Sequence, residues 1–206
     1  MKPTLLAAVA LLLATGCAAS DPEDAPVSFD ADVIFFSEPD MTRSTTVGEA
    51  LRNHRIYDGY SDEPITFKEL SGLLRAASDR ERAAEQKGTT RIYVFVAEGI
   101  YAYDAETHSL VRLFDEDRRD AVNISVDAPM YLVYMADQAT YPAALPAALV
   151  QEACRMVAET DAGLAALYAD MTGLHTYLFE DTAEDLCVML ELDANWMFAR
   201  AQSVRK

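Results

Sequence analysis

The chain has 206 residues, of which 51% are hydrophobic and 25% are charged, a balance that is ordinary for a globular protein with a sizeable core. It carries 34 acidic and 17 basic side chains, so its formal net charge is −17. Such an acidic chain repels nucleic acid and anionic lipid headgroups, and we expect no nucleic-acid partner. The acidic residues are spread along the chain, which favours a solvated surface over an acidic recognition tail.

The first residues have the pattern of a secretory signal. Lys2 is a short positive region, residues 5–14 form an apolar run too short to span a bilayer, and "ATGC" is a small-residue cleavage pattern. A Cys directly after Ala-Thr-Gly resembles a bacterial lipobox. The resemblance implies a signal peptide over residues 1–16, lipidation of Cys17 and, because Ala18 is not Asp, an outer-membrane location facing the periplasm. The alternative is an ordinary signal peptide with a chance Cys.

Residues 17–44 are predicted to be a lipid-anchored tether, because "SDPEDAP" and "SEPDMTRS" are rich in Asp, Pro and Ser. The apolar cluster "VIFF", Val33 to Phe36, interrupts this tether, and we expect a short strand there that packs on the domain. The folded domain is expected over residues 45–206.

Two helices are expected at the start of the domain. In "TTVGEALRNHR", Val47, Leu51 and His54 fall on one helical face. The segment "PITFKELSGLLRAAS" predicts a stronger helix, in which Thr66 is the N-cap and Glu69 completes a capping box. Its apolar residues follow at helical spacing, so one face of this helix is expected in the core.

Strands are expected in the middle of the chain. Residues 92–97, 100–103 and 110–114 alternate with turn signals and predict a three-stranded meander. The run "PMYLVYMA" predicts another buried strand over residues 130–136. The tyrosines in these runs are explained by sheet packing.

The last third of the chain is predicted to be helical first. Residues 145–160 and 162–171 form either two helices or one helix broken near Asp161. A strand in "GLHTYLFE" follows, and then a helix with Asp181 as its N-cap and Glu184 in the capping-box position. The final strand is "NWMFARAQSV". Together, these helices and strands predict an α+β layered domain.

The cysteine and histidine residues do not define a metal or redox site. Cys154 and Cys187 either form one disulfide or remain free thiols, because the sequence does not supply the distance between them. His54, His108 and His175 are scattered and lack the spacing of metal ligands. We therefore expect no metal.

The order of these elements and several strings resemble the flavin-dependent nitroreductase family, with the thiazoline/oxazoline dehydrogenase branch as the closest. The resemblance covers about residues 45–206 and implies a nitroreductase-like fold, mainly an antiparallel sheet flanked by helices. It also implies a homodimer with FMN in a cleft at the subunit interface, and an oxidoreductase activity. The strings that carry it are "HRIYDGYSDEPITFKELSGLLRAAS", "EGIYAYDAETHSLVRL", "DAPMYLVYMAD" and "TGLHTYLFEDTAEDLCVMLELDANWMFARAQSV".

In that family, the arginines of an R-R-S-x-R stretch hold the flavin phosphate, because guanidinium groups match its oxygens bidentately. Without a gap, the arginine positions fall on His54, Arg55 and Asp58, and the serine falls on Ile56. A carboxylate repels phosphate and a free His is mostly neutral near pH 7, so the grip is damaged. A shifted alignment instead places Arg52 and Arg55 at the first and third positions.

The resemblance adds candidate contacts near the C-terminus. The family's G-L-x-T turn, whose backbone approaches the flavin ring, falls on residues 173–176 and includes Gly173 and Leu174. The alternative for Gly173 is a helix C-cap. The family's last strand runs into V-G-Y-P, whereas this chain has "SVRK", in which Arg205 and Lys206 can supply late phosphate contacts. The family's R-T-x-P-S-A loop is replaced by "SDRERAAEQKGTT", which lacks Pro-Ser-Ala.

Two functions follow, and no catalytic residue is assigned to either. The first is an exported, lipid-anchored, FMN-dependent oxidoreductase. The second is a flavin-free relative that acts as a binding or assembly module at the membrane. The cofactor contacts expected for the first are Arg52, His54, Arg55, Gly173, Leu174 and Arg205.

Overall fold

The structure is a computed structural model that describes residues 22–41, 46, 48, 49, 52, 63–78, 89–123 and 128–206. Its elements, in chain order, are η1 (Pro22–Asp24), β1 (Val33–Phe35), α2 (Phe67–Ala77), β2 (Thr90–Val96), β3 (Gly99–Asp104), β4 (Ser109–Phe114), α4 (Arg119–Val122), β5 (Met130–Asp137), η2 (Gln138–Thr140), α5 (Ala147–Thr172), β6 (His175–Phe179), α6 (Leu186–Met189) and β7 (Trp196–Arg205).

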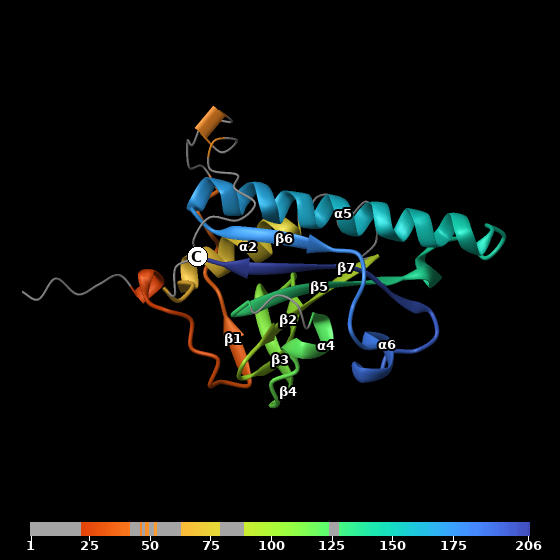
Figure 1. Ribbon diagram of the computed structural model, residues 1–206, viewed down its shortest axis with the longest axis horizontal. Coiled ribbons are helices and arrows are strands. Elements are labelled where there is room, and N and C mark those ends of the chain that lie inside the picture. Colours follow the sequence, from red (N-terminus) through yellow and green to blue (C-terminus); the bar gives the residue numbers. More distant parts are fainter. Residues whose placement is uncertain are drawn as a thin grey trace, which may run out of the picture.

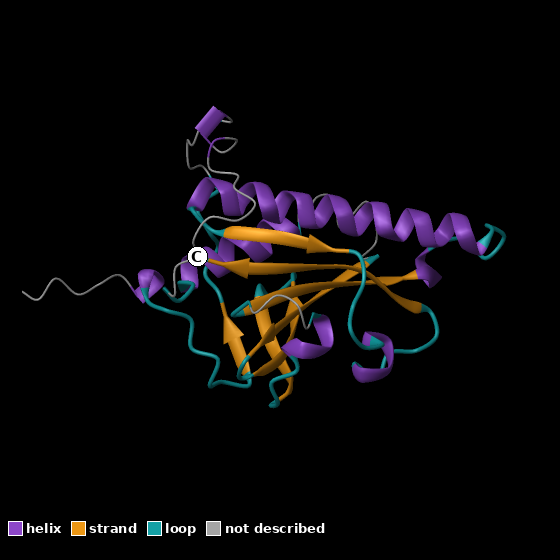
Figure 2. Cartoon of the chain, in the orientation of Figure 1, coloured by secondary structure: helices purple, strands orange, loops and turns teal. Residues whose placement is uncertain are grey.

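The described strands form one seven-stranded sheet in the order β1-β4-β3-β2-β5-β7-β6. Every pairing in it is antiparallel. The helices lie against this sheet, with the long α5 and α2 together on one side (Figures 1 and 2). The predicted α+β layered fold, a mainly antiparallel sheet flanked by helices, is therefore confirmed.

Alternation along the strands gives the sheet two buried faces. On β5, Leu132 and Tyr134 belong to the core that includes residues of α2 and α5. Tyr131 and Val133 belong to a second core that includes residues of α4 and α6. Successive side chains of a strand point to opposite faces of the sheet. Both faces of β5 are covered, which explains why the run "MYLVYMA" is apolar throughout.

Helix α2 begins as the sequence predicts. The Glu69 backbone N–H donates to Thr66 Oγ1, and the Thr66 backbone N–H donates to Glu69 Oε2 at 2.8 Å, which completes the capping box. Gly72 lies where α2 meets α5. A Cβ added to it would come within 1.9 Å of Tyr168 Oη, so the absence of a side chain permits this close approach.

The C-terminal helical region is one continuous helix, so the expected break near Asp161 is wrong. Helix α5 runs for 26 residues, and Asp161 is a buried residue within it. Neither Asp161 nor Gly163 removes a backbone donor, so packing along the sheet outweighs their low helix propensity. No helix in the described part of the chain, α5 included, is long and apolar enough to cross a membrane.

The N-cap of α6 is Asp185, and the prediction of Asp181 is wrong. The Asp185 carboxylate accepts from the backbone N–H groups of residues 187 and 188. Glu184 completes no capping box and instead forms an ion pair with Arg118 at 3.0 Å. The backbone N–H groups of residues 183 and 184 donate to carbonyls of α4, which keeps this segment out of the helix.

The described part of the predicted tether, residues 22–41, is packed on the domain. Strand β1 forms as expected and pairs with β4, with Ile34 opposite Leu110. Phe29, Ile34 and Phe36 are buried in the same core as α2 and α5. This segment therefore contributes to the core beyond the short strand that we expected in it.

The two cysteines outside the leader region are free thiols. Cys154 belongs to the core on the α5 face of the sheet, whereas Cys187 packs against the core on the opposite face. The sheet lies between them, so the structure favours free thiols over a disulfide.

Candidate functional site

The candidate site lies where α5 ends, β6 begins and β7 ends, near the C-terminus marked in Figure 1. Three of the six predicted cofactor residues meet there. Gly173 terminates α5 and Leu174 follows it, while Arg205 lies opposite His175 in the β6–β7 ladder. The structure thus brings together two residues of the G-L-x-T turn and an arginine that the sequence offers as a late phosphate contact.

Gly173 is the C-cap of α5, as one of the two interpretations predicted. Its φ is +82°, a left-handed conformation that glycine adopts without strain, and its N–H donates to the Ala169 carbonyl. Apart from Gly173 itself and its two chain neighbours, no described residue has an atom within 4 Å of the position where its Cβ would be. Leu174 is buried whereas Gly173 is exposed, so the backbone of the turn is accessible at Gly173. The geometry therefore also suits close approach by a flat ligand.

Lys206, at this end of the sheet, is already opposed by carboxylates. Arg205 is half-buried, and Lys206 Nζ lies 3.1 Å from Glu69 Oε1 and 3.9 Å from Glu63 Oε2. The two cations and two carboxylates sum to a formal charge of zero. A phosphate bound here would compete with Glu69 for Lys206.

The predicted phosphate grip is only partly within the described residues. Gly48, Glu49 and Arg52 are helical, and Arg52 is exposed. The Thr46 backbone N–H donates to the Glu49 carboxylate at 2.9 Å, and this bond, with a second from the Thr46 hydroxyl, lowers the pKa of Glu49. His54, Arg55 and Asp58 lie outside the described residues, so their roles stay predictions.

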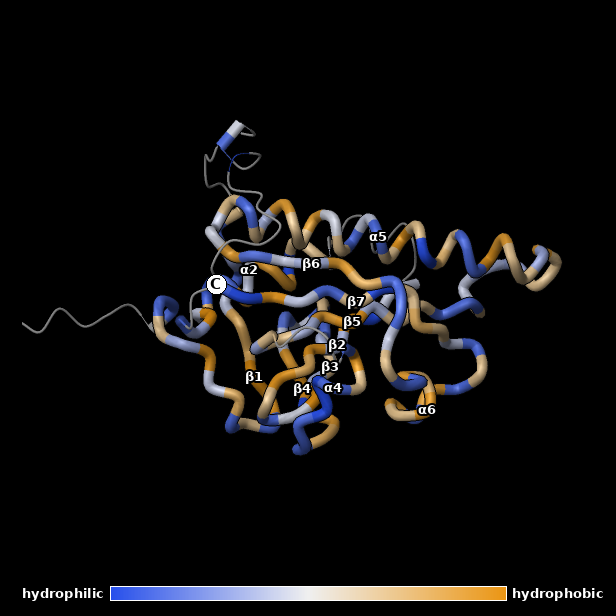
Figure 3. Tube along the Cα trace, in the orientation of Figure 1, coloured by the Kyte–Doolittle hydropathy of each residue, from blue (hydrophilic) through white to orange (hydrophobic). Residues whose placement is uncertain are grey.

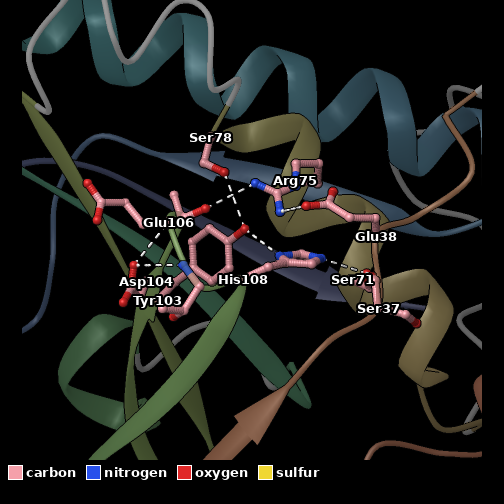
Figure 4. Close-up of polar contacts among 11 residues, drawn as sticks. Ser37, Glu38, Ser71, Arg75, Ser78, Tyr103, Asp104, Glu106 and His108 are labelled. Atoms are coloured by element: carbon pink, nitrogen blue, oxygen red, sulfur yellow. Dashed lines mark hydrogen bonds and ion pairs between the residues drawn. The ribbon is translucent and has the colours of Figure 1, made fainter.

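A buried polar network that the sequence analysis missed lies between β3, β4 and α2 (Figure 4). Ser71 Oγ is 2.9 Å from His108 Nε2, and His108 Nδ1 is 2.7 Å from Tyr103 Oη. All three side chains are buried, with exposed fractions of 2% for Ser71, 3% for His108 and 7% for Tyr103. The string "YDAETHSL", in which Tyr103 and His108 flank a turn, is the sequence feature that could have indicated this network.

One arrangement of hydrogens satisfies these atoms. The Ser71 hydroxyl donates to the Ser37 carbonyl, so His108 Nε2–H donates to Ser71 Oγ and the Tyr103 hydroxyl donates to Nδ1. His108 is then neutral. Although a Ser–His pair is a familiar nucleophilic arrangement, burial closes this one to substrate, and it serves as a structural connection.

A buried guanidinium extends this connection to the N-terminal segment. Arg75 Nη1 donates to the Ala105 carbonyl at 3.1 Å, and Nη2 pairs with the Glu38 carboxylate at 2.8 Å (Figure 4). The network therefore holds residues 37–38, helix α2 and the β3–β4 turn together. Within the part of the chain that the structure describes, no group of three or more His, Cys, Asp or Glu residues could hold a metal ion.

The order of the strands and the placement of α2 and α5 define a nitroreductase-like fold, because solved nitroreductase-family structures share this architecture. Their sequence identities to this chain are low, so the likeness shows the fold. No protein-family model and no curated protein matches the sequence.

A proposed nitroreductase of Ralstonia eutropha JMP134 aligns with a TM-score of 0.71 and 22% identity over 88% of this chain and 92% of its own. A proposed nitroreductase of Desulfovibrio desulfuricans, solved in complex with FMN, aligns with a TM-score of 0.54 and 17% identity over 79% of this chain and 86% of its own. A chain of the E. coli microcin synthetase McbBCD complex aligns with a TM-score of 0.59 and 12% identity over 98% of this chain and 84% of its own.

Proposed function

We propose that this protein is an FMN-dependent oxidoreductase of nitroreductase type. The observation that carries the proposal is the meeting of the Gly173–Leu174 turn with Arg205 at one end of a nitroreductase-like sheet. Arg205 would hold the phosphate and the backbone of the turn would lie against the ring. Bound FMN would supply hydride transfer, while the protein supplies position and electrostatics.

Flavin binding tests this proposal directly. The purified protein is mixed with excess FMN and passed through a gel-filtration column, and bound flavin is measured by absorbance. We expect stoichiometric FMN and a rise in melting temperature. Arg205→Ala should weaken FMN binding about 10-fold or more, because a charge-assisted contact contributes about 1.5–3 kcal/mol.

The matched control is Arg155→Ala, which removes an exposed arginine of α5 that lies in an i,i+3 ion pair with Glu152. This variant should bind FMN like the wild type. Melting temperatures measured without FMN would show whether either variant is destabilised. A colourless protein with no FMN-dependent gain in melting temperature would contradict the oxidoreductase proposal.

The second candidate is a flavin-free protein that uses this fold for binding or assembly. The observation that favours it is the pairing of Lys206 with Glu69 and Glu63, which removes net positive charge from the site. The predicted carboxylate of Asp58 at a phosphate-binding position points the same way. Stoichiometric flavin in the experiment above would exclude this candidate.

Within the family, we propose a place beside the thiazoline/oxazoline dehydrogenase branch. The support is the string "EGIYAYDAETHSLVRL", which forms β3, the turn and β4, together with the likeness to a chain of the McbBCD complex. The substrate class is not specified by this likeness.

We also propose export and lipid anchoring at Cys17, supported by the signal-like leader and by "ATGC". In a bacterial host, the wild-type protein should partition with the outer-membrane fraction, and Cys17→Ser should release it. The control is Ala18→Asp, which keeps the lipidated cysteine and should change the membrane of residence while membrane attachment is retained. Attachment of the Cys17→Ser protein would argue against lipidation.

A homodimer is proposed from the family resemblance, and the surface of α5 supports it. Leu149, Met156 and Leu167 are exposed along this helix. Met156→Glu should shift the protein from dimer to monomer in light scattering after gel filtration. Val188→Glu, which changes another exposed apolar residue, on α6, should leave the dimer intact. A monomeric wild type would contradict the proposal.

A further inference from the structure

One corner of the sheet exposes apolar side chains. Val33 and Phe35 of β1 and Val111 and Leu113 of β4 are all exposed, and Phe35 reaches 67%. Val33 lies opposite Val111 in the ladder, so these side chains are neighbours on one face. The hydropathy colouring also shows β1 as an apolar segment (Figure 3).

The opposite face of the same strands is covered. Ile34 and Leu110, which alternate with the exposed residues, are buried in the core. Phe29, from the N-terminal segment, packs at a tilted angle against Tyr101 of β3, with ring centroids 5.4 Å apart, and adds to this cover. At this corner one face of the sheet is covered and the other, which we call the bare face, is exposed. The bare face lies on the same side of the sheet as the second core.

The outer edge of β1 also offers backbone groups. The Phe36 N–H donates to the His108 carbonyl and the Arg112 N–H donates to the Asp32 carbonyl, so residues 32, 34 and 36 direct their backbone groups at β4. The backbone groups of Val33 and Phe35 therefore point away from β4. No described strand pairs with this side of β1. Unpaired edges of this kind are templates for an added strand.

The chain around this edge is strongly acidic. Residues 30–40 contain four carboxylates and no Lys or Arg, and residues 104–116 contain four carboxylates and one Arg. The sum within these two segments is eight negative charges against one positive, or −7, and Arg75 of α2, which pairs with Glu38, brings it to −6. The one cation within the segments, Arg112, already contacts Asp32 and donates to the Phe29 carbonyl. The bare apolar strip is therefore framed by acids.

From these three features we propose that β1 is a docking edge for an extended segment of a partner polypeptide with alternating apolar and basic side chains. Such a segment would add a strand to the sheet, cover Phe35 and Val111 with its apolar side chains, and place its Lys or Arg side chains against the acids. A second copy of this chain would bring the acidic segments together, and an anionic membrane would meet the same repulsion. This docking edge is independent of the flavin site.

The probe is a fluorescein-labelled peptide of alternating Val and Lys with blocked termini, about eight residues long, a typical strand length. Its binding to the purified protein is followed by fluorescence anisotropy. We expect saturable binding that Phe35→Ser weakens about 10-fold or more, in the range of interface anchors. Val188→Ser, an exposed apolar residue on α6, should bind like the wild type.

Three matched peptides test the separate contributions of apolar contact, positive charge and strand pairing to binding. A Ser/Lys peptide, a Val/Glu peptide and a Val/Lys peptide methylated on alternate backbone nitrogens should each bind weakly, because they lack apolar contact, positive charge and strand pairing respectively. Equal binding of the Ser/Lys peptide, or of the Phe35→Ser protein, would overturn the proposal. A smaller oligomer for Phe35→Ser than for the wild type would overturn it in favour of a second copy. Binding of the wild type to anionic vesicles that Phe35→Ser abolishes would overturn it in favour of a membrane.

Discussion

At the scale of single residues, Gly99 has a backbone conformation that other residues rarely adopt. Its φ is +143°, and an added Cβ would lie 2.1 Å from the Phe114 carbonyl oxygen. The ladder between β3 and β4 shifts register between Ile100 and Tyr101, next to this residue. The glycine therefore permits a bulge that the rest of the meander requires.

Gly99→Ala should lower the free energy of unfolding by about 2 kcal/mol or more, because the strained backbone and the clash add. Urea denaturation followed by circular dichroism measures the change. The control is Gly163→Ala, which meets no described atom within 4 Å and lies within α5, and which should raise stability by about 0.5–1 kcal/mol. A Gly99→Ala protein as stable as the wild type would contradict this account of the bulge.

Ser71 is a second single residue whose substitution should strongly lower the stability of the fold. Its hydroxyl connects the Ser37 carbonyl to His108 Nε2, and the group is buried. Ser71→Ala should destabilise the fold by about 1–3 kcal/mol, since it leaves buried polar atoms without a partner. Ser28→Ala, which removes an exposed bond to Asp30, should change stability by less than about 0.5 kcal/mol. Equal effects of the two substitutions in thermal unfolding would contradict a structural role for the network.

At the scale of elements, Asp104 organises the β3–β4 turn. Its Oδ1 accepts from the backbone N–H groups of Glu106 at 2.9 Å and Thr107 at 3.4 Å. The Thr107 side chain and these backbone bonds lower the pKa of the Asp104 carboxyl, although partial burial opposes them. A carboxylate with a lowered folded pKa contributes stability above its unfolded pKa, which is near 3.8, and loses it as the pH falls through the folded pKa.

Asp104→Asn should therefore be less stable than the wild type at neutral pH, and the difference should shrink as the pH falls below about 4. Urea denaturation at a series of pH values from neutral to strongly acid measures this. An amide can still accept from the turn, so a difference that stays constant across the series would contradict the electrostatic part of the account.

The helices show a limit of local sequence patterns. Asp181 and Asp185 both precede a short apolar run, and either can cap a helix. The choice falls on Asp185 because the preceding backbone is bonded to α4, a contact between segments far apart in the chain. Likewise, the pattern around Asp161 permits a break, but α5 is continuous and Asp161 is buried within it.

At the scale of the whole molecule, the sheet separates two cores and keeps the two cysteines apart. Burial raises the pKa of both thiols, so neither is a reactive thiolate at neutral pH. In a Cys17→Ser background, a thiol reagent should modify the half-buried Cys187 slowly and leave the buried Cys154 unmodified in the native state. Both should react after unfolding, and a reductant should not change the melting temperature. A mass two hydrogens lower than calculated would indicate a disulfide and contradict this arrangement.

The sequence by itself determined the local elements and the class of fold. Apolar runs separated by turn signals predicted β2 to β5, and the Thr66–Glu69 capping box predicted the start of α2, because these signals act between near neighbours. By resemblance it also proposed Gly173 and Leu174 as flavin contacts, and the basic C-terminal residues added Arg205 as a candidate phosphate contact. The tertiary structure decided their meeting at one end of the sheet.

Two further features depend on the tertiary structure alone. These are the pairing of charges at that end of the sheet and the exposed apolar face at β1. Lys206 is neutralised by Glu69, a residue 137 positions away, and no local pattern reports such a pair. The exposure of Phe35 depends on which strand lies beside β1 and which face the N-terminal segment covers. Residue spacing predicts hydrogen bonds between near neighbours in the chain and the buried face of a helix or strand. Contacts between distant segments depend on how the packed layers fit together.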